Sequence, residues 1–127
     1  MERALRLTYS ADFQRVRGRG RSWAHPFAVI CVLPNSLSHN RYGFSVSKRL
    51  GGAVVRNRVK RLLREAVRTT IKEAGPLVSA YDVVFVARPP VVGHTYAEVR
   101  EVVCSLLKRA GLFSIPQLPL SVEATPV

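Results

Sequence analysis

The residues best suited to chemistry in this 127-residue chain are basic side chains between positions 56 and 72. Arginine and lysine donate hydrogen bonds to phosphate oxygens and neutralise their charge. Only Glu65 and Glu73 relieve this row, and like charges one helical turn apart repel by about 0.2–0.5 kcal/mol. A bound polyanion would remove the repulsion, whereas a solvated charged surface is the alternative reading. The seven cations are Arg56, Arg58, Lys60, Arg61, Arg64, Arg68 and Lys72.

The spacing of these cations predicts one amphipathic helix over residues 54–74. At 100° per residue, one side is apolar and holds Val59, Leu62, Leu63, Ala66, Val67 and Ile71. The other side is polar and holds Asn57, Arg58, Arg61, Arg64 and Arg68, with Lys60 at the boundary. We therefore expect a helix that packs by one face and presents positive charge on the other.

The start of this helix has two further readings. Arg56 lies toward the apolar side, so it could reach a cleft beside a sheet, and Asn57 could be only a helix cap. The preceding Gly51-Gly52 pair resembles a phosphate loop. Because the chain has no complete P-loop or dinucleotide-binding glycine motif, a mononucleotide site is not expected.

The composition places the chain among nucleic-acid binders. Its formal charge is +12 and its pI about 11.1, while 47% of its residues are hydrophobic, enough for one packed domain. Neither a membrane-spanning apolar run nor a signal-peptide core is visible, so we expect a cytoplasmic protein without membrane contact.

The sequence offers no catalytic side chains or metal site. Cys31 and Cys104 lie far apart within apolar runs, and His25, His39 and His94 have no partner at ligand or triad spacing. With eight acidic residues in all, a two-metal nuclease centre is difficult to assemble from the protein. We expect no protein-bound organic cofactor.

Several elements must position the basic helix. A short helix is expected from Ser10, as its cap, to Gly18 as its stop; strands are expected within 22–33, 41–47 and 81–88. In the second strand Tyr42, Phe44 and Val46 alternate with small residues, which leaves room against that face. The capping box at Thr95 to Glu98 begins a last helix over about 96–110. Residues 112–127 contain three prolines and are expected to form a tail, packed in part through Leu112 and Phe113.

Two more groups of cations accompany these elements, together with aromatic side chains that could stack on bases. One group is Lys48 and Arg49 with Arg41 at the ends of the second strand; the other is Arg15, Arg17, Arg19 and Arg21. The aromatic residues are Phe13, Trp23, Phe27, Tyr42 and Phe44, each of which could equally belong to the core.

The segment from Gly43 to Glu65, GFSVSKRLGGAVVRNRVKRLLRE, resembles the protein subunit of bacterial ribonuclease P. Strand, loop and Arg-Asn-Arg helix occur in the order typical of that family. Asp12-Phe13 in the first helix and the strand Asp82–Arg88 agree with it, so the resemblance covers about residues 5–110.

This resemblance implies an α+β fold: a single-domain αβββαβα two-layer sandwich, with a mixed sheet and a left-handed βαβ crossover that general handedness rules would not predict. The RNA-binding domain would span residues 1–111. It also implies that the catalyst is an RNA subunit with bound Mg²⁺, and that the protein binds this RNA and the 5′ leader of precursor tRNA. We expect a monomeric protein, one copy per RNA.

The resemblance implies two sets of site residues. The RNA subunit would be bound by Arg49, Arg56, Asn57, Arg58, Lys60, Arg61, Arg64 and Arg68. The leader cleft would be lined by Phe13, Arg17, Phe27, Phe44, Ser45, Ser47, Lys48 and Arg56.

Two positions depart from the family pattern. Arg17 stands where a second aromatic often follows Phe13 by one turn, and aliphatic residues around Ile30 replace another aromatic. Leader binding is therefore expected to depend more on charge than on stacking. A general RNA chaperone or ribosome-associated RNA-binding protein is the alternative function; a DNA-binding module is disfavoured because no helix-turn-helix is visible.

Overall fold

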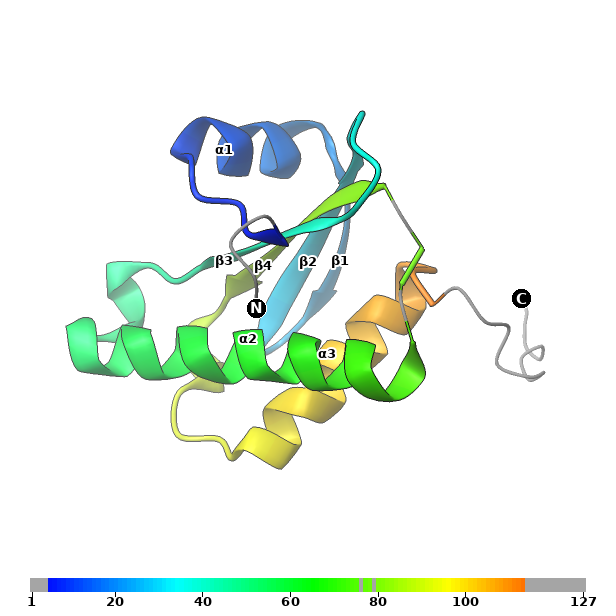
Figure 1. Cartoon of the computed structure of the whole chain (residues 1–127). Coiled ribbons are helices and arrows are strands. Elements are labelled where there is room, and N and C mark those ends of the chain that lie inside the picture. Colours follow the sequence, from blue (N-terminus) through cyan, green and yellow to red (C-terminus); the bar gives the residue numbers. More distant parts are fainter. Residues whose placement is uncertain (1–4, 76, 79, 114–127) are drawn as a thin grey trace.

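The computed structural model describes residues 5–75, 77–78 and 80–113. Three α-helices and a four-stranded sheet confirm the α+β class (Figure 1). In chain order the elements are α1 (Ser10–Arg19), β1 (Arg21–His25), β2 (Ala28–Pro34), β3 (Arg41–Ser45), the 3-10 helix η2 (Lys48–Leu50), α2 (Ala53–Ala74), β4 (Tyr81–Ala87), the 3-10 helix η3 (Pro89–Val91) and α3 (Tyr96–Arg109). In this part of the chain no helix is long and apolar enough to cross a bilayer.

The sheet has the order β1-β2-β4-β3 and is mixed. β2 pairs antiparallel with β1 and β4, whereas β3 pairs parallel with β4 through the α2 crossover. The segment 22–33 forms two strands, as the αβββαβα order requires, because the chain reverses at Pro26 and Phe27. β2 is an inner strand, as its apolar residues on both faces predict. The handedness of the crossover stays a prediction.

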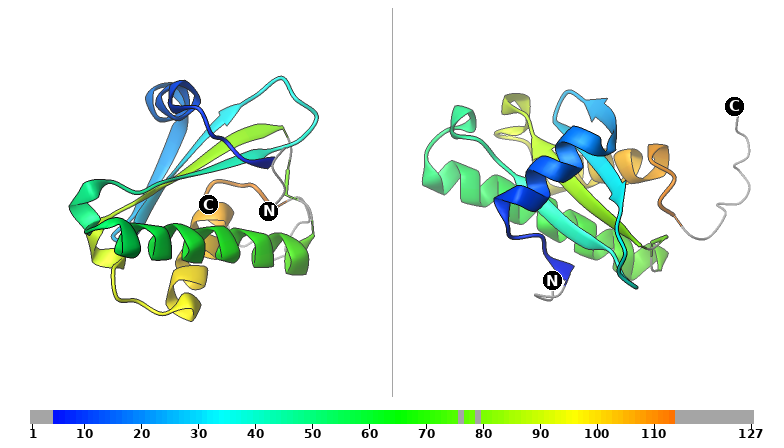
Figure 2. Two further views of the ribbon diagram at one scale, coloured as in Figure 1. Left: turned by 60° about the vertical axis from the view of Figure 1, so that its left-hand side comes forward. Right: turned by 90° about the horizontal axis from the view of Figure 1, so that it is seen from above.

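Helices cover both faces of the sheet, with α2 and α3 on one and α1 on the other (Figures 1 and 2). The main core lies between the sheet and α2 and α3, and includes Ile30, Leu63, Phe85 and Leu106. A smaller cluster beneath α1 contains Leu7, Val16, Cys31 and Val84. The two main layers of the sandwich are thus extended by one short helix.

The first helix differs from its expected bounds. Ser10 is its first residue rather than its cap, and the cap position, Tyr9, makes no side-chain hydrogen bond. The helix continues past Gly18 and ends before Gly20. A Cβ at Gly20 would lie 2.7 Å from the carbonyl oxygen of Val32, so glycine is needed where the chain turns into β1.

The two later helices follow the sequence pattern closely. α2 buries Val59, Leu63, Ala66 and Val67 and ends at Gly75. α3 begins at the complete capping box formed by Thr95 and Glu98.

Leu112 and Phe113, which were expected at the start of the tail, pack on the domain. Leu112 is buried, and Phe113 forms a β-bridge with Leu77. Residues 114–127 of the expected tail lie outside the described residues.

Candidate nucleic-acid interface

The outer face of α2 carries a row of cations along 22 residues of continuous helix. Asn57, Arg58, Arg61 and Arg68 are exposed, while Arg56, Lys60 and Arg64 are half-buried. Asn57 lies inside the helix, and Gly52 occupies the cap position, so Asn57 is not a cap.

Most of these cations lack a carboxylate partner. Arg68 pairs with Glu65, but within the described ranges no carboxylate forms an ion pair with any of Arg56, Arg58, Lys60, Arg61 and Arg64. The Nε atoms of Arg56 and Arg64 are also buried without a hydrogen-bond partner. This face therefore keeps most of its positive charge for an external anion, although the two buried Nε atoms do not themselves face solvent.

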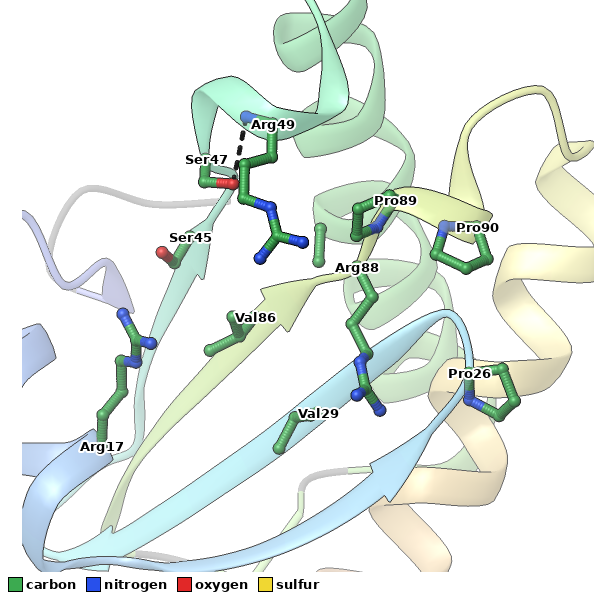
Figure 3. Close-up of a pocket in the computed structure, with 11 residues that line it drawn as sticks. Arg17, Pro26, Val29, Ser45, Ser47, Arg49, Val86, Arg88, Pro89 and Pro90 are labelled. Carbon is green, nitrogen blue, oxygen red and sulfur yellow. Dashed lines mark hydrogen bonds between the residues drawn. The ribbon is translucent and has the colours of Figure 1, made fainter.

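A cleft of about 680 Å³ opens beside α1 on the opposite face of the sheet (Figure 3). Its floor is formed by Val29, Val86 and Ser45, from three neighbouring strands. Arg17, Arg49 and Arg88 enter it from the end of α1, from η2 and from the end of β4 (Figure 3). The cleft thus combines an apolar floor with guanidinium groups spaced around it, of which Arg88 also donates to the His25 carbonyl, a surface suited to an extended phosphodiester chain.

The structure brings together only part of the expected leader-binding set. Arg17, Ser45 and Ser47 line the cleft, and so does Arg49, which was expected to bind the RNA subunit. Lys48 and Arg56 are not among the lining residues. Phe27 packs against the rings of His25 and His94 instead.

Phe13 and Phe44 line two smaller hollows next to the cleft, of about 270 and 390 Å³. Lys60 lines both hollows, and the larger one shares Arg17 and Ser45 with the cleft. Phe44 is also stacked on Phe85 in the core at 5.9 Å between ring centroids. The aromatic rings therefore border the cleft rather than form its floor.

Sequence reasoning missed Arg88 and the floor residues Val29 and Val86. The signal for Arg88 was present in the alternation of β4, because Asp82, Val84, Val86 and Arg88 share one parity and so one face. Val29 gave no such signal, since β2 is apolar on both faces.

Two other arginines pair with a buried carboxylate and so have a structural role. Asp82 has no exposed surface, and it accepts hydrogen bonds from Arg41 (Nε, 2.9 Å, and Nη2, 2.8 Å), from Arg15 (2.7 Å) and from Asn35 (2.9 Å). Burial alone would raise the pKa of Asp82, but the hydrogen bonds from Arg41, Asn35 and Arg15 outweigh it and lower the pKa to about 2.

The sequence placed Arg15 and Arg41 in groups of cations, and the structure shows that carboxylates of the protein pair with both. Both are engaged by Asp82, and Arg15 also contacts Asp12 on its own helix. Because Arg15 lies on α1 and Arg41 on β3, the network ties α1 to the sheet. We call Asp82, Arg15, Arg41, Asn35 and Asp12 the Asp82 network. It holds the helix that forms one wall of the cleft.

No group of three or more His, Cys, Asp or Glu side chains that could hold a metal ion occurs in the described part of the chain. Burial raises the pKa of the Cys31 thiol, which packs in the small cluster beneath α1. The chemistry that the described site residues do offer is phosphate binding by guanidinium and ammonium groups.

Known proteins resemble this chain over nearly all of its described part. The sequence profile of the family described as Ribonuclease P matches residues 1–111. The chain is 43% identical over 114 residues to the ribonuclease P protein component of Dehalococcoides mccartyi strain CBDB1, covering 90% of this chain and 91% of that one. It is 42% identical over 113 residues to the counterpart of Roseiflexus castenholzii, with 88% and 90% covered.

Solved structures show the same likeness. An RNase P protein mutant from Staphylococcus aureus with defective mRNA degradation activity superposes with a TM-score of 0.79 at 35% identity, covering 89% of this chain and 93% of that one. The RNase P protein from Thermotoga maritima superposes with a TM-score of 0.72 at 29% identity, covering 82% and 96%.

Proposed function

Because the chain belongs to the bacterial ribonuclease P protein family, the protein component of a ribonucleoprotein endoribonuclease, we propose that it binds two RNAs through two surfaces. The outer face of α2 binds the catalytic RNA subunit. The cleft beside α1 holds the 5′ leader of precursor tRNA during endonucleolytic removal of that leader.

The observation that carries this proposal is the uncompensated charge of α2. Exposed cations with no carboxylate partner keep their full attraction for phosphates, and each contact releases about one condensed counterion from the RNA. The residues assigned to this contact are the unpaired cations Arg56, Arg58, Lys60, Arg61 and Arg64, together with the polar Asn57 and with Arg68, which is shared with Glu65.

The cleft supports leader binding by charge more than by stacking. Its lining residues include Arg17, Arg49 and Arg88 but no aromatic ring. Single-stranded RNA would lie with its phosphates toward these guanidinium groups and its bases over the apolar floor. Phe13 and Phe44 would touch the leader only where it passes the neighbouring hollows.

In this division of labour the RNA subunit supplies catalysis together with bound Mg²⁺. The protein positions the leader and neutralises phosphate charge, so less Mg²⁺ is needed to bring the RNAs together. One protein copy per RNA subunit is sufficient, because both surfaces are present on one chain.

Reconstitution tests this proposal. Addition of the protein to its RNA subunit should accelerate cleavage of precursor tRNA at low Mg²⁺, and RNA-free protein should cleave nothing. No acceleration combined with good binding to unrelated RNAs would favour a general RNA chaperone. Mg²⁺-dependent cleavage by RNA-free protein would overturn the division of labour.

Paired variants separate the two surfaces. Arg17→Ala with Arg88→Ala should reduce the preference for precursor over mature tRNA several-fold and leave RNA-subunit affinity unchanged. Arg58→Ala with Arg61→Ala should lower the affinity for the RNA subunit and leave the preference for precursor over mature tRNA unchanged. Arg100→Ala is the matched control, because Arg100 is already paired with Glu73. Equal effects of both pairs on both measurements would contradict the assignment.

A further inference from the structure

A second recess combines aromatic and cationic side chains away from both proposed RNA surfaces. It has a volume of about 250 Å³ and is lined by Arg19, Arg21, Trp23, Pro34 and Tyr81, with backbone following α3. None of its lining residues also lines the cleft. Among the residues that the structure describes, the lining contains no carboxylate.

The strands place this recess at the opposite end of the sheet from the cleft. In β4, Val86 faces the cleft near one end, whereas Tyr81 begins the strand at the other end. Pro34 pairs with Tyr81 at the end of β2. A ligand in the recess would therefore not compete for the cleft itself.

The side chains of the recess are arranged for stacking. Arg21 and Trp23 share one face of β1, and the guanidinium carbon of Arg21 lies 5.2 Å from the Trp23 ring centroid. Trp23 and Tyr81 are half-buried and pack against the main core, so each ring is fixed on one side. Arg19 and Arg21 are exposed, and neither forms an ion pair with a described carboxylate.

The recess is smaller than the roughly 300–1,000 Å³ typical of drug-sized ligands, which favours a single planar group. The Arg21 guanidinium, supported from behind by the Trp23 ring, and the Tyr81 ring suit an unpaired nucleobase, and Arg19 beside them suits its phosphates. We propose that Arg19, Arg21, Trp23 and Tyr81 form a further RNA site, which takes one unpaired base with its adjoining phosphates.

The base can come from the precursor tRNA or from the RNA subunit, since both present the same chemistry. Binding of a short RNA to the recess does not depend on the proposed function, whereas assignment to one of these two RNAs does rest on it. Titration with a short RNA measures binding alone, and quenching in assembled complexes identifies the source of the base.

Trp23 is the only tryptophan of the chain, so its fluorescence reports on this recess directly. Titration with a 5′-phosphorylated adenosine trinucleotide should quench Trp23 emission and shield it from acrylamide. An abasic trinucleotide with equal charge should do neither. No change with the adenosine trinucleotide, or equal change with the abasic one, would overturn the proposal.

Variants test the same site without relying on the tryptophan. Arg19→Ala and Arg21→Ala lie on the surface and should weaken trinucleotide-induced quenching, whereas Lys72→Ala, which removes an exposed cation outside the recess, should not. Trp23→Phe should keep binding, measured by anisotropy of a labelled trinucleotide. Trp23→Ala should weaken binding by about 5- to 150-fold, the range expected for one stacked base. Loss of quenching in Arg17→Ala, a cleft variant, would contradict a separate site.

The source of the base is found by acrylamide quenching of assembled complexes. Shielding of Trp23 by the RNA subunit alone assigns the base to that subunit. Shielding that appears only when precursor tRNA, and not mature tRNA, joins the complex assigns it to the leader. Unshielded Trp23 in every complex would overturn a role in the ribonucleoprotein.

Discussion

The Asp82 network and the outer face of α2 use the same residue type in opposite ways. Arg15 and Arg41 both pair with the buried Asp82 and with Asp12, so two carboxylates of the protein offset their two charges. Arg58 and Arg61 on α2 have no such partner and face solvent. The position of the few carboxylates, rather than the number of arginines, decides which cations hold the fold together and which remain for RNA.

The largest effect on stability is expected when the buried carboxylate is removed. Asp82→Asn leaves two guanidinium groups beside a neutral amide, and we expect about 3 kcal/mol lower free energy of unfolding, measured by urea denaturation. Glu73→Gln removes the exposed partner of Arg100 and should leave the free energy of unfolding almost unchanged, because solvent screens an exposed pair. Similar losses in the two variants would show that burial does not distinguish the two kinds of pair.

Acid should break the same network without mutation. The pKa of Asp82 is about 2 in the folded chain, below its ordinary value of 3.8, so its contribution is present above pH 3.8. The contribution is lost as pH falls from about 4 to about 2, and amounts to about 2 kcal/mol. Urea denaturation across this range should show a smaller acid-induced loss in Asp82→Asn than in the unmodified chain. An equal acid-induced loss of stability in the two proteins would show that carboxylates other than Asp82 cause it.

A smaller effect tests how far packing, rather than charge, holds α1 on the sheet. A Cβ at Gly43 would lie 2.7 Å from the ring of Phe13 and 3.1 Å from Cβ of Leu7. Gly43→Ala should therefore lower the free energy of unfolding by about 1 kcal/mol, with partial recovery when Phe13→Leu is added. Gly18 lies on α1, the helix that carries Phe13, and a Cβ there would meet no atom within 4 Å. Gly18→Ala should therefore be neutral or stabilising. An unchanged stability of Gly43→Ala would leave the charge network as the main attachment of α1.

Local patterns predicted the basic helix well, because its burial repeats every turn and its polar side needs no distant partner. The small face of β3 was also predicted correctly, and the structure shows that Phe13 packs against Gly43 there. The Asp82 network could not be predicted in this way, since Arg15 and Arg41 lie 67 and 41 positions from Asp82. Only the tertiary fold brings these two arginines to Asp82, so that they are no longer available to bind RNA.

For the same reason, local sequence patterns could not bring together the three arginines of the cleft. Its arginines come from α1, η2 and the end of β4, three segments that no local pattern joins. Phe27 was expected beside them because the family resemblance implied that it lines the leader cleft. The reversal at Pro26 and Phe27 places it against His25 and His94 instead.

The most direct test of whether the outer face of α2 binds the RNA subunit is the salt dependence of that binding, because its slope counts the cations that contact phosphate. In a plot of log affinity against log salt concentration, Arg61→Ala should make the slope shallower by about 0.9. Arg100→Ala, which removes a paired arginine from α3, should leave the slope of the unmodified protein unchanged. An unchanged slope in Arg61→Ala, or an equal change in both variants, would contradict the assignment of the unpaired face of α2 to the RNA subunit.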